Sequence, residues 1–370
     1  MPATLIVTND FPPRIGGIES FVTDVCALLD HDVVVYASGP PGAAATDADR
    51  DYPVVRSGRL LLPTRAVATQ VTELVRRHRI SRVVFGAAAP LGLLAPTLRA
   101  AGVHRIIGLT HGHETWWARL PGPRSVLHRI GNGCDHLTVI SAFTEQRISA
   151  ALSPRARARL LRLPPPIDTD LFRPEPFRGP TNRGSAVAVG RFVAQKGFDT
   201  LLRAWRRVLD QVPGRAASPD LVLVGDGPQR PRLQRLIERL GLAAAVRITG
   251  AVPRTQVIAE LRRADVFVLP MRTRLAGLNP EGLGLAAIEA AACGLPVLVG
   301  NSGGAPETVL PGRSGFVIDP NDPVGLADRL TAVLADPVGG RAMGAAGRRF
   351  VGERFGAEQA RRTLRRALDL

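Results

Sequence analysis

The stretch Asn279-Pro-Glu-Gly-Leu-Gly-Leu-Ala-Ala-Ile-Glu-Ala-Ala-Ala-Cys-Gly-Leu-Pro-Val-Leu-Val299 predicts a loop, then a helix, then a buried strand. Gly282 and Gly284 allow the backbone to approach a ligand closely, and residues 285–292 are strong helix formers. Gly294 ends the helix, and the last three residues are typical of a buried parallel strand. A helix that begins at such a turn offers unpaired N–H groups and a partial positive charge. This end of the helix therefore suits a phosphate group.

Two carboxylates, Glu281 and Glu289, flank the predicted helix start, with Gly282, Leu283 and Gly284 between them. At a rise of about 1.5 Å per residue, the two acids lie on the order of 10 Å apart. Carboxylates accept paired hydrogen bonds from vicinal hydroxyls, so this arrangement matches a nucleotide sugar, whose diphosphate separates a sugar from a ribose. The alternative is two solvated surface acids, but the apolar residues around them favour a ligand site.

A second loop, Gly190-Arg-Phe-Val-Ala-Gln-Lys-Gly197, follows a predicted strand and carries Arg191 and Lys196. Two cations at the carboxyl end of a strand can neutralise a diphosphate as the bond to its sugar breaks. Lys196 is the single lysine in the sequence, and the rest of the 48 basic residues are arginine. Lysine is a compact point charge and arginine a broad fork, so they are not equivalent at a crowded anion site. The alternative is a surface turn with two solvated cations.

Near the N-terminus, the apolar run Thr4–Thr8 leads through a proline-rich turn to Gly16 and Gly17, and then to a predicted helix over 19–29. This order places backbone N–H groups at the carboxyl end of a first parallel strand, where doubly wound sheets bind ligands. The two glycines also fit a simple turn.

Strands and helices alternate along both halves of the chain, which predicts an α/β protein with two Rossmann-like, doubly wound domains. Its 370 residues are enough for two complete cores. We expect an N-terminal, acceptor-binding domain over 1–172, a proline-rich linker over 173–184, a C-terminal, nucleotide-sugar-binding domain over 185–351 and a final helix over 352–370.

The net charge of +16 raises the possibility of nucleic-acid binding, but the arginines are dispersed, no recognised binding motif occurs and aromatic residues are only 5%. We therefore expect no nucleic-acid partner. Basic clusters at 76–79 and 155–162 are either solvated helix faces or contacts with an anionic membrane.

No run of residues is long and apolar enough to span a membrane, and no signal peptide is recognisable at Met1. We expect a cytoplasmic protein that could contact the inner face of the plasma membrane. Cys26, Cys134 and Cys293 are isolated in the sequence, and we expect three buried thiols rather than disulfides or a metal site.

Several motifs together resemble the retaining glycosyltransferases of family 4: Glu281-x7-Glu289, Gly303-Gly-Ala-Pro-Glu307, Thr8–Ser20, Phe85–Pro90, Thr110–Glu114 and Met343–Gly347. The resemblance covers essentially the whole chain. It implies the GT-B fold, in which two domains face a cleft and the C-terminal helix crosses back to the first domain. It also implies retention of configuration without a metal ion, and a histidine near the transferred sugar, best matched by His111 and next by His113.

Within this family the motifs are most similar to actinobacterial phosphatidylinositol mannoside mannosyltransferases, which implies GDP-mannose as donor and a glycolipid acceptor. One segment departs from the pattern, since relatives have a glycine-rich, aspartate-containing loop where this chain has Arg274-Leu-Ala-Gly-Leu-Asn-Pro280. A transferase that moves another UDP- or GDP-linked sugar to a small soluble acceptor is therefore an alternative. A non-catalytic RNA- or membrane-binding protein is a third hypothesis.

Two groups of residues could suggest a metal ion. His111, His113 and Glu114 are clustered, but they lack the helical spacing of a zinc site. Asp168-Thr-Asp170 formally matches a metal–diphosphate motif, but its position beside three prolines predicts a turn. We therefore expect no metal cofactor.

Overall fold

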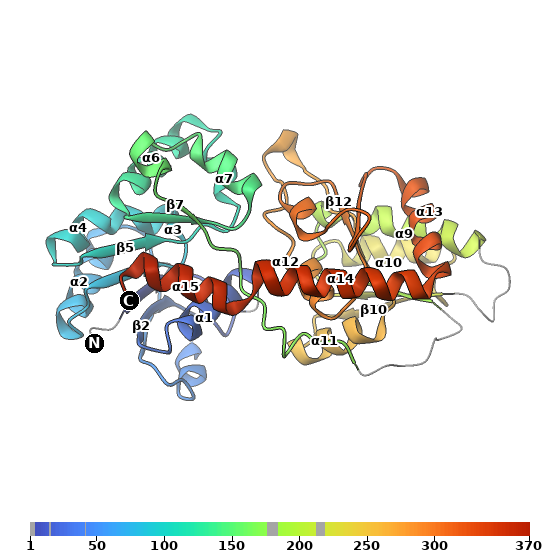
Figure 1. Cartoon of the computed structure of the whole chain (residues 1–370). Coiled ribbons are helices and arrows are strands. Elements are labelled where there is room, and N and C mark those ends of the chain that lie inside the picture. Colours follow the sequence, from blue (N-terminus) through green and yellow to red (C-terminus); the bar gives the residue numbers. More distant parts are fainter. Residues whose placement is uncertain (1–3, 15, 41, 176–183, 212–218) are drawn as a thin grey trace. The chain divides into compact units, whose positions relative to one another are not determined.

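The computed structural model describes residues 4–14, 16–40, 42–175, 184–211 and 219–370. The chain forms two compact units (Figure 1): unit 1 comprises Met1–Pro166 and Ala357–Leu370, and unit 2 comprises Ile167–Gly356. The sequence placed the end of the first domain at 172 and the start of the final helical segment at 352, each a few residues from the divisions at 166/167 and 356/357. Most of the predicted linker, at 176–183, lies outside the described residues.

Unit 1 contains a parallel seven-stranded sheet in its described residues, with the order β3-β2-β1-β4-β5-β6-β7. The strands are β1 (Thr4–Thr8), β2 (Val33–Ser38), β3 (Val54–Ser57), β4 (Arg82–Phe85), β5 (Arg105–Gly108), β6 (His136–Val139) and β7 (Leu160–Arg162). Every residue of β1 and β2 is buried, as expected for strands in a parallel sheet with covered faces.

The helical segments of unit 1 are α1 (Gly17–Leu28), η1 (Ala43–Asp47), α2 (Arg65–Arg77), α3 (Ala88–Leu91), η2 (Gly92–Leu94), α4 (Ala95–Ala100), α5 (Glu114–Trp117), α6 (Pro121–Gly133), α7 (Ala142–Ser149), α8 (Pro154–Arg157) and α15 (Ala357–Leu368). Apolar side chains of α2, α4 and α6 form one core cluster with the strands. The sheet and its helices therefore form the layered core that the alternating sequence predicted.

The C-terminal helix α15 belongs to unit 1, where it contacts α1 and β5 (Figure 1). Its buried residues, Ala360, Leu364, Ala367 and Leu368, recur at helical spacing and form one apolar face. Arg82 of β4 donates from Nε to the Leu368 carbonyl oxygen at 2.8 Å. This end of the chain is therefore attached to the first sheet by both apolar and polar contacts.

Unit 2 contains a parallel six-stranded sheet in its described residues, with the order β10-β9-β8-β11-β12-β13. The strands are β8 (Ser185–Val189), β9 (Asp220–Val224), β10 (Val246–Gly250), β11 (Val266–Leu269), β12 (Val297–Gly300) and β13 (Gly315–Ile318). The helical segments are η3 (Ala194–Lys196), α9 (Phe198–Gln211), α10 (Arg230–Arg239), α11 (Arg254–Arg263), η5 (Leu275–Gly277), α12 (Leu285–Ala292), η6 (Ala305–Thr308), α13 (Pro323–Ala335) and α14 (Pro337–Phe355).

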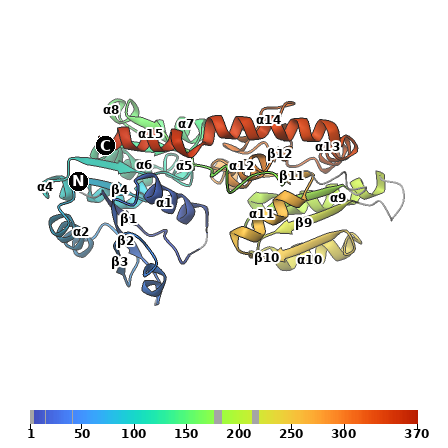
Figure 2. The same ribbon diagram turned by 60° about the horizontal axis from the view of Figure 1, so that its bottom comes forward.

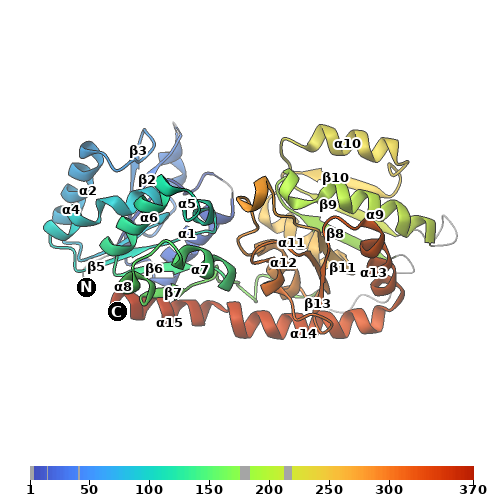
Figure 3. The same cartoon turned by 90° about the horizontal axis from the view of Figure 1, so that it is seen from above.

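The helices of unit 2 pack in pairs on the sheet. Helix α9 contacts α13, whereas α12 contacts α14, β11 and β12. Figures 2 and 3 both show α12 beside α14. Helix α12 has the limits that the sequence predicted, and the predicted α/β architecture of both units is confirmed.

Some elements were not expected. Strands β3, β7 and β13 were not predicted from the sequence, and the expected helix over 352–370 is divided at Gly356, whose extended backbone separates α14 from α15. Among the described residues, every helix is too short or too polar to cross a lipid bilayer.

The close packing of α14 on the end of α12 predicts opposite effects for two glycine substitutions in one helix. A Cβ atom on Gly344 would lie 1.8 Å from the Gly294 carbonyl oxygen, whereas one on Gly352 would meet nothing within 4 Å. We expect Gly344→Ala to lower the free energy of unfolding by about 1–3 kcal/mol through overpacking. Gly352→Ala should raise it by roughly 0.5–1 kcal/mol, since alanine is the better helix former. Urea unfolding measures both, and equal stability of the two variants would contradict this packing.

Candidate active site

Lys196 and Glu281 meet at the carboxyl edge of the unit 2 sheet. Lys196 ends η3 in the loop after β8, and Glu281 precedes α12 in the segment after β11, the strand beside β8. The Lys196 Nζ atom lies 2.8 Å from Glu281 Oε2, and their side chains are 21% and 12% exposed. An ammonium group can donate three hydrogen bonds, so this ion pair leaves Lys196 able to bind further acceptors. The sequence placed both residues at a ligand site but did not indicate that they pair.

The loop that carries Lys196 is fixed by Arg272, which follows β11. The Arg272 guanidinium donates to the Ala194 carbonyl oxygen at 2.8 Å and forms an ion pair with Asp199. Gln195 donates from its side-chain amide to the Pro280 carbonyl oxygen at 2.6 Å, directly before Glu281. The Lys196 loop and the Glu281 loop are therefore connected by hydrogen bonds on both sides of the ion pair.

Close backbone contact explains the glycine that follows Lys196. Gly197 has φ +72°, and a Cβ atom there would lie 2.0 Å from the Pro270 carbonyl oxygen. A larger residue would separate the Lys196 loop from the end of β11. Gly197 thus allows the approach that brings the ammonium group to Glu281.

The backbone of Glu281 is held by hydrogen bonds to the segment that follows β12. The Glu281 N–H donates to Ser302 Oγ at 3.2 Å, and the Glu281 carbonyl oxygen accepts from the Gly304 N–H at 2.9 Å. The Ser302 hydroxyl lies 2.9 Å from the Thr273 hydroxyl. Sequence patterns did not indicate Thr273, Ser302, Gln195 or Arg272, because their contacts join residues that are distant along the chain.

The predicted anion-binding turn lies at the start of α12. Gly284 is the N-cap, with φ 98°, and no side chain of the described residues caps the helix there. Leu283 is buried, Gly282 lies in the turn before it, and Glu289 lies within α12 with its Oε1 4.0 Å from Arg254 Nη2. The turn is thus bordered by Glu281 on one side and by Glu289 inside the helix.

Arg191 lies at the start of the same loop as Lys196, with an exposed side chain. The adjoining backbone is fixed to the loop after β9, where the Phe192 N–H donates to the Asp226 carbonyl oxygen at 2.8 Å. The Gly227 N–H, and next the Arg230 guanidinium, hold the pKa of Asp226 below its ordinary value. The loops after β8 and β9 are therefore attached to each other beside the candidate site.

His111, Gly16 and Gly17 belong to unit 1, and each has its own local setting. His111 follows β5, and its Nε2–H donates to the Gly86 carbonyl oxygen at 2.5 Å, which leaves Nδ1 as the acceptor of a neutral ring. Burial lowers the pKa of His111 from its ordinary value of 6.5, more than the nearby Glu114 raises it. The ring is therefore neutral at physiological pH.

Glu114, which follows the same strand as His111, is a fully buried carboxylate. Its Oε2 accepts from the N–H groups of His111 at 2.9 Å and Gly112 at 3.2 Å, and its Oε1 lies 3.3 Å from His113 Nε2. Glu114 thus fixes the turn that carries His111. Within the described ranges, no three His, Cys, Asp or Glu side chains are placed to hold a metal ion.

Gly16 and Gly17 form the start of α1, which begins two residues before the helix predicted over 19–29. Gly16 is the N-cap with extended backbone, and the described residues provide no side-chain cap. A Cβ atom on Gly16 would lie 2.4 Å from Glu19 Oε2. The Glu19 carboxylate therefore lies beside the start of α1.

Other expectations from the sequence are also resolved. Asp168 Oδ1 accepts from the N–H groups of Asp170 and Leu171, each at 2.9 Å, which forms the predicted turn. Cys26, Cys134 and Cys293 are free and buried, as predicted, and burial raises the pKa of each thiol to about 12.

Comparison with known proteins gives the family. The model described as Glycosyltransferase Family 4 matches residues 15–171, and the model described as Glycosyl transferases group 1 matches 174–350. A GDP-mannose-dependent alpha-(1-6)-phosphatidylinositol monomannoside mannosyltransferase from Mycolicibacterium smegmatis is 44% identical over 94% of this chain and 93% of its own length. The chain belongs to glycosyltransferase family 4.

Two further proteins extend the comparison. A GDP-mannose-dependent monoacylated alpha-(1-6)-phosphatidylinositol monomannoside mannosyltransferase from Corynebacterium glutamicum is 41% identical over 94% of this chain and 93% of its own length. The crystal structure of Anabaena Alr3699/HepE in complex with UDP has a TM-score of 0.80 at 17% identity, covering 99% of each chain. This family 4 member is therefore an enzyme of GT-B fold, and the hypothesis of a non-catalytic binding protein is wrong.

The lowered pKa of His111 predicts part of the pH dependence of stability. Below about pH 6.5 an unfolded chain protonates this ring, whereas the folded protein keeps it neutral until its lower pKa is reached. Stability contributed by the neutral ring is thus lost as the pH falls through this window. We expect wild-type protein to lose more stability between about pH 7.5 and pH 5.5 than His111→Gln. His104 is exposed, so His104→Gln should follow the wild type. Denaturant unfolding at each pH tests this, and parallel curves for wild type and His111→Gln would contradict it.

Proposed function

We propose that this enzyme transfers mannose, with retention of configuration, from GDP-mannose to a phosphatidylinositol mannoside acceptor. One observation carries the proposal: over 94% or more of its length, the chain is 41–44% identical to relatives that are named as GDP-mannose-dependent phosphatidylinositol monomannoside mannosyltransferases. The paired Lys196 and Glu281 beside an uncapped helix start support a nucleotide-sugar site in unit 2.

Each predicted residue has a role in this proposal. Lys196 and Arg191 neutralise the diphosphate as its bond to the sugar breaks, which is electrostatic stabilisation of a leaving group. The N–H groups at Gly282, Leu283 and Gly284 bind the same phosphates at the start of α12. Gly16 and Gly17 of unit 1 supply further N–H groups to the diphosphate.

Three side chains orient the donor around these phosphates. Glu281 accepts from hydroxyls of the mannose, and Glu289 accepts from hydroxyls of the ribose. His111, held neutral by burial, presents Nδ1 as an acceptor to the transferring sugar. No metal ion is required in this proposal, because the cations and helix N–H groups provide the positive charge.

The lipid part of the proposed acceptor implies contact with a membrane surface. The basic residues at 76–79, at the end of α2, and at 155–162, around α8, are the candidates for contact with anionic lipid, each contributing about 1 kcal/mol near the surface. In this arrangement the enzyme works as a peripheral protein at the cytoplasmic face.

One feature supports a second candidate, transfer of a different sugar to a small soluble acceptor. The segment before Glu281 forms a closed hairpin, in which Arg274 and Asn279 exchange N–H to carbonyl bonds at 3.0 and 3.1 Å. Leu275 and Ala276 have positive φ values of 53° and 50°, a conformation that is uncommon for residues other than glycine. Such a compact hairpin next to the sugar-binding carboxylate could select another donor.

The central test is transfer from labelled sugar donors. Purified enzyme with GDP-mannose and phosphatidylinositol monomannoside should form a dimannoside product, and excess EDTA should leave the rate unchanged. Lys196→Ala should lower the rate by about 10² to 10³, since a leaving-group cation is lost. Transfer only from UDP-sugars, or only to soluble acceptors, would favour the second candidate. Complete loss in EDTA, restored by magnesium, would refute the proposal of a metal-independent reaction.

The proposed orientation of the donor is tested by titration of two variants. Glu289→Gln should weaken GDP and GDP-mannose binding by a similar factor of at least about tenfold, since a charge-assisted bond is worth roughly 1.5–3 kcal/mol. Glu281→Gln should leave GDP binding unchanged or stronger, because Lys196 is released from its partner, and yet reduce transfer.

Calorimetry gives both affinities for each variant. Glu260 of α11 provides the control, because it is a buried carboxylate that pairs with Arg247 of β10. Glu260→Gln should bind GDP as the wild type does. Loss of GDP binding in Glu281→Gln with normal binding in Glu289→Gln would mean that the donor lies in the reverse orientation.

A further inference from the structure

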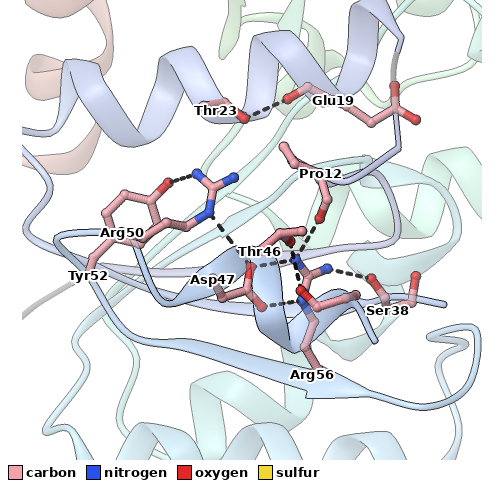
Figure 4. A network of polar contacts seen from close by, with 10 residues as sticks. Pro12, Glu19, Thr23, Ser38, Thr46, Asp47, Arg50, Tyr52 and Arg56 are labelled. Carbon is pink, nitrogen blue, oxygen red and sulfur yellow. Dashed lines mark hydrogen bonds and ion pairs between the residues drawn. The ribbon is translucent and has the colours of Figure 1, made fainter. Parts of the chain in front are cut away.

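The guanidinium of Arg56, on β3, holds three separate segments at the carboxyl edge of the unit 1 sheet (Figure 4). Its Nε and Nη2 donate to the two carboxylate oxygens of Asp47, in η1, at 2.8 and 2.7 Å. Its Nη1 donates to the carbonyl oxygen of Ser38, the last residue of β2, at 3.0 Å. Its Nη2 also donates to the Pro12 carbonyl oxygen at 2.5 Å. From β3, one side chain thus connects the loop that follows β1 with the end of β2 and the segment that follows it.

This ion pair is nearly buried, with Arg56 12% and Asp47 10% exposed. The cost of removing two charges from water offsets much of their attraction, so a buried pair contributes little net stability. The fixed fork of arginine, however, specifies direction at each of its hydrogen bonds. The main effect of the Arg56–Asp47 pair is therefore to fix the backbone conformation of the segments that Arg56 binds, rather than to add stability.

The segment that depends most on Arg56 is the loop between β1 and α1. Asn9 exchanges two hydrogen bonds with the backbone of Leu61, at 2.9 and 2.7 Å, and fixes the start of the loop. Pro12 and Pro13 have no N–H group, so their carbonyl oxygens are their only backbone hydrogen-bonding groups. Among the described residues of this loop, the bond from Arg56 to Pro12 is therefore one of the attachments between Asn9 and the helix start at Gly16.

A second arginine connects the same network to α1 itself. Arg50 lies over the buried Phe11 ring, 4.7 Å from its centroid, and donates to the Tyr52 hydroxyl at 2.9 Å. The Tyr52 hydroxyl in turn lies beside the Cys26 thiol of α1 and affects its pKa. Both the loop and the helix that follows it are thus fixed to one polar cluster, which Figure 4 shows below the first turn of α1.

We propose that Arg56 is a positioning residue for sugar transfer: by holding the Pro12 carbonyl oxygen, it sets the position of the Gly16 and Gly17 N–H groups that bind the diphosphate. This inference rests on the proposed function of that glycine turn. Because its nearly buried guanidinium is bound to Asp47, Ser38 and Pro12, we infer that Arg56 acts through the loop. A displacement of about 1 Å in such a binding group can cost on the order of 10²-fold in rate.

The chain contains a matched control on the opposite edge of the same sheet. Arg99 forms an ion pair with Asp135, which precedes β6, and donates to the carbonyl oxygens of Val103 at 3.2 Å and His104 at 2.6 Å, which precede β5. As at Arg56, one arginine binds one aspartate and two carbonyl oxygens, but these contacts lie at the amino edge of the unit 1 sheet. Arg99→Met therefore removes a similar set of contacts, from a more exposed pair, without affecting the glycine turn.

The test compares Arg56→Met, Arg56→Lys and Arg99→Met in hydrogen exchange and in transfer, each at a temperature about 15 °C below its own Tm. Arg56→Met should speed exchange of the amides at residues 16–20, lower kcat by at least about tenfold and also raise the Kd for GDP, because the displaced N–H groups bind the diphosphate. Arg56→Lys, which keeps the charge but not the fork, should be intermediate. Arg99→Met should leave both kcat and these amides as in the wild type.

Two outcomes would overturn the inference: unchanged exchange at 16–20 in Arg56→Met, or an Arg56→Met enzyme that keeps its kcat within about twofold. Failure of the proposed function is distinguishable, because wild-type protein would then transfer no mannose. The exchange measurement would still decide whether Arg56 positions the turn.

Discussion

The ion pair between Arg272 and Asp199 is the constraint on which the candidate donor site depends. From the end of β11, Arg272 binds the Ala194 carbonyl oxygen in the loop after β8. Because β8 and β11 are neighbours in the sheet, this attachment brings Lys196 to the segment that carries Glu281. Without it, two flexible loops would have to be ordered by the ligand itself, at a cost in binding free energy.

The two units use a similar device. In unit 1, Arg56 and Asp47 hold the Pro12 carbonyl oxygen in the loop after the first strand, β1. In unit 2, Arg272 and Asp199 hold a carbonyl oxygen in the loop after the first strand, β8. In each unit, the guanidinium of a mostly buried arginine fixes the loop backbone that precedes a glycine, Gly16 in unit 1 and Gly197 in unit 2. A repeated solution of this kind suits a fold in which ligand-binding loops must be placed accurately on rigid sheets.

These contacts also account for part of the basic composition. The net charge of +16 would suit a nucleic-acid partner, but many arginines bind within the protein. Arg348, for example, donates to the carbonyl oxygens of Thr169, Phe172 and Ala292, and so connects the start of unit 2 with the end of α12. A guanidinium has five donors in a planar fork, which lysine lacks, and this explains arginine at such positions. Lys196, the single lysine of the sequence, instead pairs with Glu281.

The sequence by itself determined the α/β alternation, the limits of α12 between Gly284 and Gly294, the buried thiols and the residues that flank the helix start, because each has a local signal in glycine placement or apolar periodicity. Strands β3, β7 and β13 escaped prediction, since they are short and lie at or next to the sheet edges, where the alternation of buried residues is weak. Asp47 ends η1, a short segment of small residues with no local signal of its partner Arg56. Only the tertiary structure decided this pair, the Lys196–Glu281 contact and the Arg272 clamp, because their members are distant in sequence and meet only when parallel strands align their carboxyl ends.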